Sequence, residues 1–336
     1  MSVTIKDVAR EAKVATSTVS RVLSGKGRIS ESTKERVSEA IKKLNYTPNV
    51  IARGLAKSRT RILAVVLPEG ADKFFSNPFY TQAMKGISLC SQEENYFIMY
   101  AFIDSNDEGW LKKFTESNLV DGLILFNAKE NDDNIKYLKE IKFPFVIIGH
   151  SNDLEDILWV DNDNFSAMYN LTRKLIELNH DNIAFVGAQR DLKFTNERLK
   201  GYIEGLISKN REVDYSLIYE CNDFTEMEGR KIAEKMLEDN IIPSAILATD
   251  DLLAFGVQNY FYSKNIFDIS IVGFNNTLLA QYQEIPLSSV DINSEKLGYY
   301  ASKVLIDNLE MRENRKQYYI IETELIERES INYNKK

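Results

Sequence analysis

Apolar residues recur at two different spacings along the chain, and the spacing changes near residue 60. Before that point they return every three or four positions, as on one face of an α-helix, in three stretches: 5–12, 16–24 and 30–46. Beyond it, apolar runs of strand length alternate with amphipathic stretches of helix length. The pattern predicts a small all-α unit at the N-terminus and a larger α/β body after it.

The first two helices are predicted to lie close together, joined by a brief turn. Thr4 and Asp7 have the spacing of a capping box, which starts the first helix. The apolar face of that helix consists of small residues, Val8, Ala9 and Ala12. In the turn at 13–15, the apolar side chain of Val14 is expected to fill the space between the two helices. Two short helices joined in this way form a helix-turn-helix.

The second helix has one apolar and one polar face. Its apolar face holds Val19, Val22 and Leu23. Hydroxyl groups and one arginine occupy the other face: Thr16, Ser17, Thr18, Ser20 and Arg21. Such groups reach phosphates and base edges in a major groove. The sequence therefore predicts a DNA-binding helix-turn-helix, with a helical hairpin that binds no DNA as the alternative.

A third helix and a short final segment complete the N-terminal unit. Four apolar residues at i, i+3, i+4 and i+7 close a three-helix core: Val37, Ala40, Ile41 and Leu44. The segment 48–60 opens with Pro48, a favoured first residue of a helix. It is too short to be stable alone in water, and Gly54 costs about 1 kcal/mol more. We expect it to become helical only when another molecule holds it.

The charge of the chain is split between the two parts. The net charge is −8, yet residues 1–60 hold 13 Lys and Arg against 5 Asp and Glu, a net of +8, and the remainder has a net charge of −16. This split is typical of a polyanion-binding head on a body that the polyanion does not attract. A merely solvated basic face would have the same charge.

Eight apolar runs in the body have the length of buried strands: 62–68, 96–102, 121–127, 144–150, 157–163, 182–188, 244–250 and 269–275. Helical patterns lie between them near 79–94, 107–118, 132–140, 164–178, 196–209, 226–239 and 251–263. This alternation predicts parallel sheets flanked by helices on both faces. So many strands suit two lobes, with a break near Val160 and Asp161, and a ligand cleft where the carboxyl ends of the strands meet.

The sequence lacks the motifs of the common enzyme classes. It has no P-loop, GxSxG, HExxH or GxGxxG after a strand, so we expect neither catalysis nor a cofactor.

Cys90 and Cys221 lie far apart, and His150 and His180 have no partner at metal-ligand spacing, which argues against a disulfide or a metal site. With no run of 18 apolar residues and no signal-peptide pattern, a cytoplasmic protein is expected.

The segments "TIKDVAREAKVATSTVSRVLS" and "LNYTPNVIARGLA", continued through the body, resemble the LacI/GalR (lactose-repressor) family of bacterial transcription regulators. In that family the second helix enters the major groove. The resemblance implies base contacts from Thr16, Ser17 and Arg21. It implies phosphate contacts from a further set of polar residues, Thr4, Thr18, Ser20, Ser24 and Asn49.

The resemblance also implies a hinge helix that folds on the operator. Leu55 of each subunit would wedge into the minor groove, and Ala52 and Arg53 complete the matching hinge. Two residues depart from the family pattern. Lys13 stands in the turn where many members have glycine, and Ala15 stands where a serine often opens the second helix.

The family fold implied for the body is that of periplasmic sugar-binding proteins. The predicted domains are a helix-turn-helix domain at 1–47, a hinge helix and linker at 48–60, and a two-lobed effector-binding and dimerisation domain at 61–336. Because the chain is expected to cross between the lobes three times, lobe 1 comprises about 61–160 and 292–320. Lobe 2 then comprises about 161–290 and 321–336.

Polar and aromatic residues at predicted strand ends form the implied effector site: Asn77, Phe79, Tyr80, Arg198, Phe224, Thr249, Asp250 and Asn275. The donors of Arg198 suit hydroxyls or a carboxylate, and Phe224 offers a platform for a sugar face. Taken singly, these residues also have plain structural interpretations, such as a surface ion pair for Arg198 and a helix cap for Asp250. Asn275 replaces the aspartate of many members and fits a neutral carbohydrate.

The sequence therefore predicts a homodimeric repressor that binds a pseudo-palindromic operator in double-stranded DNA and is controlled by a small carbohydrate. The segments "GFNN", "VDNDN" and "NPFY" look like those of maltose-operon repressors of low-GC Gram-positive bacteria, which points to maltose or a maltooligosaccharide. Two alternatives stay open. One is control by a corepressor or protein partner, as in catabolite-control regulators, and the other is a carbohydrate-binding protein with a vestigial head.

Overall fold

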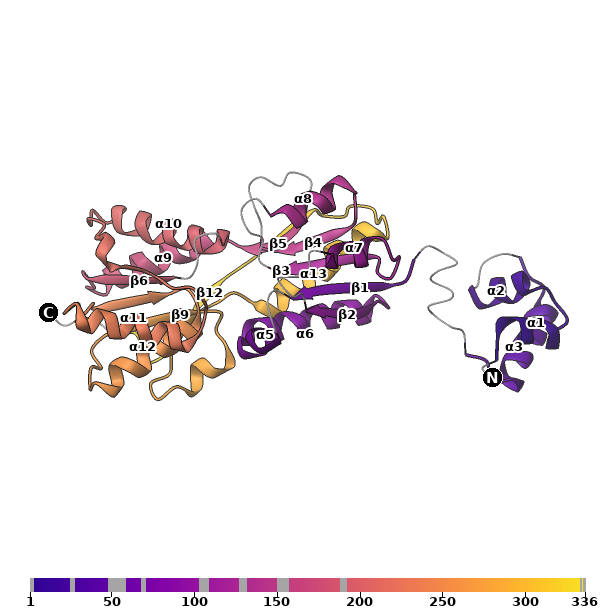
Figure 1. The fold of residues 1–336 in the computed structure, drawn as a ribbon, viewed down its shortest axis with the longest axis horizontal. Helices are drawn as coiled ribbons and strands as arrows, with labels where there is room; N and C mark the ends of the chain where they lie inside the picture. Colours follow the sequence, from indigo (N-terminus) through magenta and orange to yellow (C-terminus); the bar gives the residue numbers. More distant parts are fainter. Residues whose placement is uncertain are drawn as a thin grey trace. The chain divides into compact units, whose positions relative to one another are not determined.

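The computed structural model describes residues 3–24, 28–47, 59–67, 71–102, 109–126, 132–149, 157–187, 192–332 and 334. The chain divides into two compact units, Met1–Thr60 and Arg61–Lys336, hereafter the head and the body (Figure 1). Of the predicted hinge segment 48–60, residues 48–58 lie outside the described residues. No helix in the described part of the chain is long and apolar enough to cross a membrane.

The head contains the three predicted helices, α1 (Ile5–Glu11), α2 (Thr16–Ser24) and α3 (Glu31–Lys43). The predicted cap of α1 is present, because Oδ2 of Asp7 accepts hydrogen bonds from the backbone N–H of Thr4 at 3.0 Å and from its hydroxyl at 2.7 Å. One valine from each helix is fully buried: Val8, Val19 and Val37. The head therefore depends on a small core.

The turn between α1 and α2 is a Schellman motif. The N–H of Val14 donates to the carbonyl of Ala9 at 3.0 Å, and the N–H of Lys13 donates to that of Arg10 at 3.3 Å. Lys13 has a φ of 53°, in the left-handed region that glycine adopts without steric cost. The lysine at this position therefore strains the turn slightly.

A six-stranded sheet forms the centre of each lobe of the body. In lobe 1 the order is β11-β5-β4-β3-β1-β2, all parallel: β1 (Ile62–Leu67), β2 (Phe97–Phe102), β3 (Gly122–Phe126), β4 (Phe145–Ile148), β5 (Leu158–Asn162) and β11 (Tyr318–Ile321). In lobe 2 the order is β12-β10-β9-β8-β6-β7: β6 (Ile183–Gly187), β7 (Ile218–Glu220), β8 (Ala245–Ala248), β9 (Ser270–Phe274), β10 (Ser288–Asp291) and β12 (Glu324–Ile326). Only β12 runs antiparallel to its neighbour in these two sheets.

All eight predicted strands are present. The strands that the sequence pattern did not predict are β7, β10, β11 and β12. They are three or four residues long, and β7, β10 and β12 each include polar or charged residues, so these three do not stand out as apolar runs. The two sheets confirm the predicted parallel α/β body, apart from the antiparallel strand β12.

Helices cover both faces of the sheets. Those of lobe 1 are α5 (Ala71–Ser76), α6 (Pro78–Glu93), α7 (Trp110–Thr115), α8 (Asp133–Glu140) and α13 (Ser294–Leu309). Those of lobe 2 are α9 (Asn164–Glu177), α10 (Lys193–Ile207), α11 (Glu226–Glu238) and α12 (Asp251–Ser263), and short 3-10 turns occupy Tyr215–Leu217 and Leu278–Tyr282. α5 and α13 were not predicted. α13 packs so closely on α6 that a Cβ on Gly298 would lie 1.9 Å from the carbonyl oxygen of Ala83.

Within the described ranges of the body, three connections join the two lobes. The first follows β5 and leads from Asn162 to α9, the second leads from β10 to α13, and the third leads from β11 to β12. β5 and β11 end at Asn162 and Ile321, so the first sheet extends one or two residues beyond the positions 160 and 320 expected from the sequence. The connections lie together at the carboxyl ends of several strands, which brings polar residues of both lobes to one place.

Candidate functional site

The exposed face of α2 carries the three residues predicted to contact bases, Thr16, Ser17 and Arg21, together with Ser20, which is predicted to contact phosphate. Thr16, Ser17, Ser20 and Arg21 are exposed, whereas Val19 on the other face is fully buried. Thr18 is half-buried. Because α2 contains no acidic residue, this face offers hydroxyl and guanidinium donors without a charge that repels phosphate.

The remaining predicted DNA contacts are described only in part. Thr4 is exposed, but its hydroxyl donates to Asp7, so it must leave that carboxylate before it donates to a phosphate. Ser24 ends α2, and its side chain lies outside the described part of the structure. The hinge residues Asn49, Ala52, Arg53 and Leu55 also lie outside the described residues. Their roles stay predictions.

Acidic residues of α1 and α3 form ion pairs with nearby basic residues. Nζ of Lys43 lies 2.6 Å from Glu11, and Nζ of Lys34 lies 2.6 Å from Glu31. The two hydrogen bonds from Thr4 hold the pKa of Asp7 below its usual value. These ion pairs are exposed and contribute little to stability. The positive charge of the head comes from its other basic residues.

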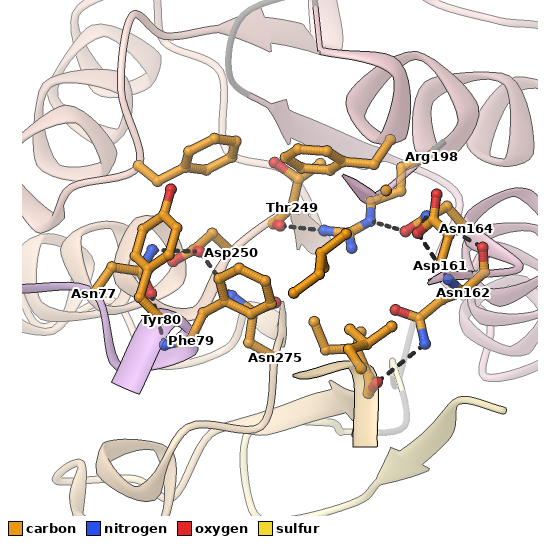
Figure 2. A pocket seen from close by; sticks show the side chains of 16 residues that line it. Asn77, Phe79, Tyr80, Asp161, Asn162, Asn164, Arg198, Thr249, Asp250 and Asn275 are labelled. Carbon is orange, nitrogen blue, oxygen red and sulfur yellow. Dashed lines mark hydrogen bonds between the residues drawn. The ribbon is translucent and has the colours of Figure 1, made fainter. Parts of the chain in front are cut away.

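A pocket lies between the two lobes, at the carboxyl ends of their strands (Figure 2). It contains about 530 Å³ of empty space, part of it open to solvent, a size typical of small-molecule sites. All eight residues predicted to bind an effector line it: Asn77, Phe79 and Tyr80 from lobe 1, and Arg198, Phe224, Thr249, Asp250 and Asn275 from lobe 2. The structure brings these residues together, while their part in binding stays a prediction.

Arg198 extends from α10 into the pocket and is only 4% exposed. Its Nε donates to Oδ1 of Asn164 at 2.9 Å, and its Nη1 donates to the backbone carbonyl of Thr249 at 2.6 Å. These bonds fix the plane of the guanidinium group. The surface ion pair considered from the sequence is therefore wrong for Arg198, because the group is buried.

The surroundings of Arg198 combine aromatic rings and carboxylates. Its Cζ lies 4.2 Å from the ring centroid of Phe274 and 5.0 Å from that of Phe194. Burial lowers the pKa of Arg198 to about 10, and the negative charges of Asp161 and Asp250 oppose that shift. The guanidinium therefore stays charged at neutral pH.

Asp250 connects the two lobes. Its Oδ1 accepts from the N–H of Leu252 at 2.7 Å, as a cap of α12. Its Oδ2 accepts from the amide of Asn275 at 2.8 Å and from that of Asn77, in lobe 1, at 3.2 Å. Asn77 also caps its own helix, α6, by accepting from the N–H of Phe79 at 3.0 Å. Burial raises the pKa of Asp250 to about 6, against the effect of these hydrogen bonds.

Asn275 is held by its backbone as well as by its side chain. It has a φ of 100°, and its N–H donates to the carbonyl of Val290 at 2.9 Å. The fully buried Asp251 fixes the turn that follows, because it accepts from the N–H and hydroxyl of Thr277 at 2.6 and 2.9 Å and from the hydroxyl of Ser289 at 2.6 Å. Burial raises the pKa of Asp251 to about 7. The amide of Asn275 is thus placed before any ligand arrives.

Aromatic side chains line the pocket from both lobes. In lobe 2, Phe194 and Phe224 stack with ring centroids 5.7 Å apart and an angle of 26° between their planes. In lobe 1, Phe79 and Tyr80 pack edge to face against Phe126, with centroids 6.0 and 5.3 Å from its ring. Each lobe therefore offers an aromatic surface, and Phe79 and Tyr80 also pack against the hydrophobic core.

The chemistry of the pocket is that of a binding site. Among the described residues that line it, Arg198 is the only base, and Asp161 and Asp250 are the only acids. The hydroxyl of Thr249 is buried without a hydrogen-bond partner, which a ligand can supply. No cluster of three or more His, Cys, Asp or Glu side chains suited to a metal ion occurs in the described ranges of the chain.

Several residues of the pocket were not predicted. Asp161, Asn162 and Asn164 line it at the end of β5 and the start of α9, and Phe194 lines it one helical turn before Arg198. A signal for the first three was present, because "VDNDN" follows a predicted strand just as "ATDD" does. The i, i+4 spacing to Arg198 was the available signal for Phe194.

A helix-turn-helix head joined to a two-lobed body with a small-molecule pocket defines the class of ligand-responsive DNA-binding regulators. Two family models match the chain: "Bacterial regulatory proteins, lacI family" at residues 4–49 and "Periplasmic binding protein-like domain" at residues 172–331.

Three relatives illustrate the match. The HTH-type transcriptional regulator MalR of Streptococcus pneumoniae is 37% identical over 323 residues, which cover 94% of this chain and 96% of that protein. Catabolite control protein A of Priestia megaterium is 32% identical over 311 residues, 91% of this chain and 92% of that protein. The solved structure of a transcriptional regulator CelR-cellobiose complex is 29% identical, covers 98% of this chain and 99% of its own, and has a TM-score of 0.76.

The chain belongs to the lacI family of bacterial regulatory proteins. The resemblance seen in the sequence is confirmed, and the protein is a transcriptional regulator rather than an enzyme.

Proposed function

We propose that the chain is a homodimeric repressor that acts in the cytoplasm on the operator of a sugar-utilisation operon and responds to a small carbohydrate in the pocket between its lobes. Maltose or a maltooligosaccharide is the first candidate. The observation that carries the proposal is the composition of the pocket. Fixed amides, carboxylates and aromatic surfaces from both lobes meet there around the guanidinium group of Arg198.

This composition suits a neutral sugar. Sugar rings present C–H faces that pack on aromatic rings such as Phe194 and Phe224, and hydroxyls that pair with amide and carboxylate oxygens. A phosphorylated or acidic ligand is disfavoured, because Arg198 already donates to protein oxygens and lies near Asp161 and Asp250. Among the described residues that line the pocket, no second positive charge is present to pair with an added anion.

The names of the relatives support a carbohydrate. The 37% identical relative is named MalR, and the regulator CelR was solved as a complex with cellobiose. Cellobiose is a neutral disaccharide, as maltose is. The proposal extends this ligand class to the present chain.

For the head, we propose that α2 lies in the major groove and that Thr16, Ser17 and Arg21 contact bases. The exposure of these three residues supports the assignment. Phosphate contacts are assigned to Thr4, Thr18, Ser20, Ser24 and Asn49. In the hinge, Ala52 and Arg53 precede Leu55, which is proposed to wedge into the minor groove of a bent operator.

Apolar residues on the surface of the body support a homodimer. On the edge strand β2, Phe97 is 60% exposed and Phe102 is 43% exposed, and Leu89 on the neighbouring α6 is 40% exposed. In lobe 2, Leu278 is 63% exposed and Tyr282 is 72% exposed. Apolar surface of this kind marks a protein contact, and two heads on one dimer suit a pseudo-palindromic operator.

A second candidate keeps the DNA-binding head and replaces the inducing sugar by a corepressor or a protein partner. The 32% identical relative named catabolite control protein A favours it. A carbohydrate-binding protein with a vestigial head is the remaining alternative. The intact cap, core and polar face of the head weigh against it.

The proposal is tested by selecting DNA from a random pool with the full chain and by measuring sugar binding by calorimetry. The expected results are a pseudo-palindromic site, a steep loss of its affinity with salt, and binding of maltose or maltotriose but not of maltose phosphate. The salt dependence follows from the release of counterions from DNA phosphates. A selected palindrome with no sugar bound supports the second candidate, whereas failure to select any sequence supports the vestigial head.

A further inference from the structure

One side chain contacts all three connections between the lobes. Asn162 lies in the first connection, at the end of β5. Its Nδ2 donates to the carbonyl of Ile292, in the second connection, at 3.0 Å and to the carbonyl of Ile321, where the third connection begins, at 2.9 Å. Both hydrogens of the amide are therefore used. The three segments that join the lobes are tied together at a single point.

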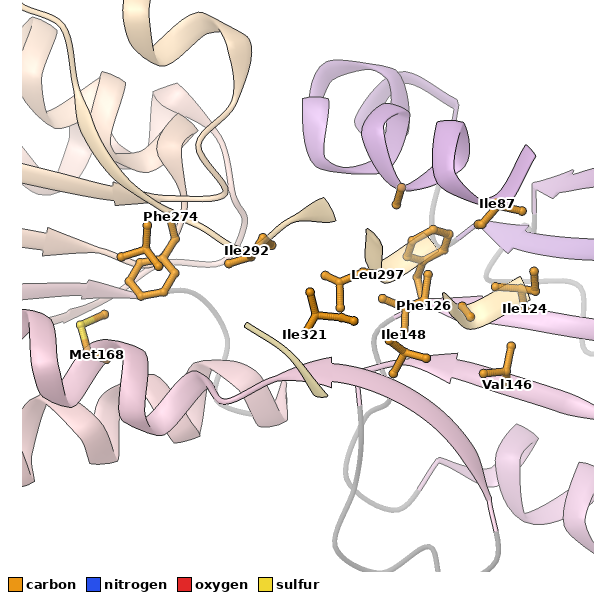
Figure 3. Close-up of a cluster of buried hydrophobic side chains, with 14 of the residues drawn as sticks. Ile87, Ile124, Phe126, Val146, Ile148, Met168, Phe274, Ile292, Leu297 and Ile321 are labelled. Atoms are coloured by element: carbon orange, nitrogen blue, oxygen red, sulfur yellow. The ribbon is translucent and has the colours of Figure 1, made fainter. Parts of the chain in front are cut away.

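The tie is buried in an apolar environment. Asn162 is 5% exposed, Ile292 is 3% exposed and Ile321 is 6% exposed. Figure 3 shows Ile292, Leu297 and Ile321 lying between the buried side chains of the two lobes. Because a buried carbonyl without a donor is costly, loss of the amide of Asn162 would leave the carbonyls of Ile292 and Ile321 unpaired at a cost in free energy.

The other end of the same side chain faces the pocket. Asn162 lines the pocket, and Figure 2 shows its nitrogen bonded toward the connection and its oxygen on the side of the pocket. Within the part of the chain that the structure describes, no donor is placed on this Oδ1. A ligand hydroxyl can therefore donate to it.

Hydrogen bonds also link Asn162 to Arg198. The backbone N–H of Asn162 donates to Oδ1 of Asp161 at 2.7 Å, and the same oxygen accepts from the amide of Asn164 at 3.0 Å. Asn164 in turn accepts from Nε of Arg198 at 2.9 Å. A continuous chain of bonds thus runs from Arg198 to the point where the connections are tied.

We propose that Asn162 is a positioning residue that couples ligand binding to the angle between the lobes. Its nitrogen holds the three connections in one arrangement, and its oxygen presents an acceptor to the ligand. A ligand bound to that oxygen changes the relative free energies of the arrangements that the connections adopt. The tie itself is a property of the free protein, while the coupling rests on the proposed function.

The tie is tested without ligand by measuring distances between spin labels on the two lobes. Labels are placed on the full chain through Lys112→Cys and Glu234→Cys, at exposed positions of lobe 1 and lobe 2, with labelled subunits diluted in unlabelled protein. Asn162→Asp, which replaces two donors by acceptors, is expected to broaden the distance distribution. The matched control Asn134→Asp makes the same change at an exposed position of α8 and is expected to leave it unchanged.

Asn162→Ala removes the amide without adding a charge and serves as the second variant if the aspartate variant does not fold. It is also expected to broaden the distribution. A distribution identical to that of the parent protein in the variants that fold would overturn the tie.

The coupling is tested by measuring operator affinity with and without maltose, and maltose affinity by calorimetry. For Asn162→Asp, operator affinity is compared without maltose and at a maltose concentration that calorimetry shows to saturate the variant, and the effect of maltose is expected to fall by about fivefold or more, the lower range of allosteric coupling. An unchanged effect of maltose overturns the coupling. If the parent protein does not respond to maltose, the proposed function fails, and the label distances still decide the tie.

Discussion

The head and the body present recognition surfaces of opposite character. On α2, Thr16, Ser17, Ser20 and Arg21 are exposed, and a small core of valines and alanines supports them. In the pocket, Arg198 and Asp250 are each 4% exposed and Asn275 is 6% exposed, and protein hydrogen bonds hold all three. The head presents exposed polar side chains, whereas the body holds its polar side chains in fixed positions.

The difference follows from the partners that the two regions are proposed to bind. A DNA phosphate backbone attracts a basic head over a long range, so exposed donors on one helix suffice to start binding. A neutral sugar provides no such attraction. Its affinity depends on groups that are already in place and lose little freedom when it binds.

The largest effect that separates the two regions is expected for Arg198→Ala. Removing this guanidinium leaves Asp161 and Asp250 without their buried counter-charge, which costs about 3–5 kcal/mol in the body. Operator binding by the head is expected to persist at low temperature, while the response to sugar is lost. Fluorescence anisotropy with labelled operator measures both properties.

Arg173→Ala is the matched control for this change, because it removes an arginine of the same lobe that does not line the pocket. It is expected to keep the sugar response. A normal response in Arg198→Ala would remove Arg198 from the ligand site.

Arg21→Ala is expected to affect only the head. It should cost about 1–3 kcal/mol of operator affinity and relax discrimination between operator sequences, because a base contact is lost. Arg36→Ala on α3 removes an exposed arginine from the same unit without touching α2 and is expected to leave discrimination unchanged. Equal discrimination by Arg21→Ala and the parent protein would refute the base contact.

The two regions are expected to respond to pH in opposite directions. Asp250 has its pKa raised to about 6 by burial, so its contribution to stability is fully present below the unfolded value near 3.8 and is lost as pH rises toward 6. Asp7 has its pKa lowered by Thr4, so its contribution is present above that unfolded value and is lost in acid.

Both tryptophans, Trp110 and Trp159, belong to the body, so urea unfolding followed by tryptophan fluorescence reports on that unit. Between about pH 4 and pH 6, the ionisation of Asp250 is expected to lower the free energy of unfolding of the parent protein by on the order of 1–3 kcal/mol. Asp250→Asn is expected to lack this decrease. Identical pH dependence in the variant and the parent would show that burial does not shift Asp250.

The smallest effect is expected in the turn of the head. Lys13→Gly removes the steric cost of the left-handed backbone conformation at this position and should stabilise the head by about 1 kcal/mol, whereas Lys13→Ala keeps that cost. Amide hydrogen exchange in α1 and α2 measures the local change. Lower protection in the glycine variant than in the alanine variant would contradict the strain.

The sequence predicted the parts of the fold that depend on neighbours along the chain. The cap at Thr4 and the periodic apolar faces located α1, α2 and α3 closely, because each signal lies within a few residues of its effect. Strand and helix alternation predicted a cleft at the carboxyl ends of the strands, where parallel strands end at the same edge, whereas the residues that line it were implied by the resemblance to the LacI/GalR family. The short strands β10 and β12 carry no such local signal.

Asn162 shows what sequence patterns do not reveal. Its two carbonyl partners lie 130 and 159 residues away along the chain. Nothing near Asn162 in the sequence indicates that three connections meet there. Likewise, the close packing of Gly298 against α6 is visible only once the two helices are placed together.

The central claim is that a neutral sugar in the body controls DNA binding by the head. The most direct measurement is operator affinity of the full chain at fixed salt, titrated with maltose, maltotriose and maltose phosphate. The account predicts that a neutral sugar weakens operator binding and that, by reciprocity, operator weakens sugar binding by the same factor, while the phosphorylated sugar has no effect. Operator affinity that stays constant with every neutral sugar, or that changes only with the phosphorylated one, would contradict it.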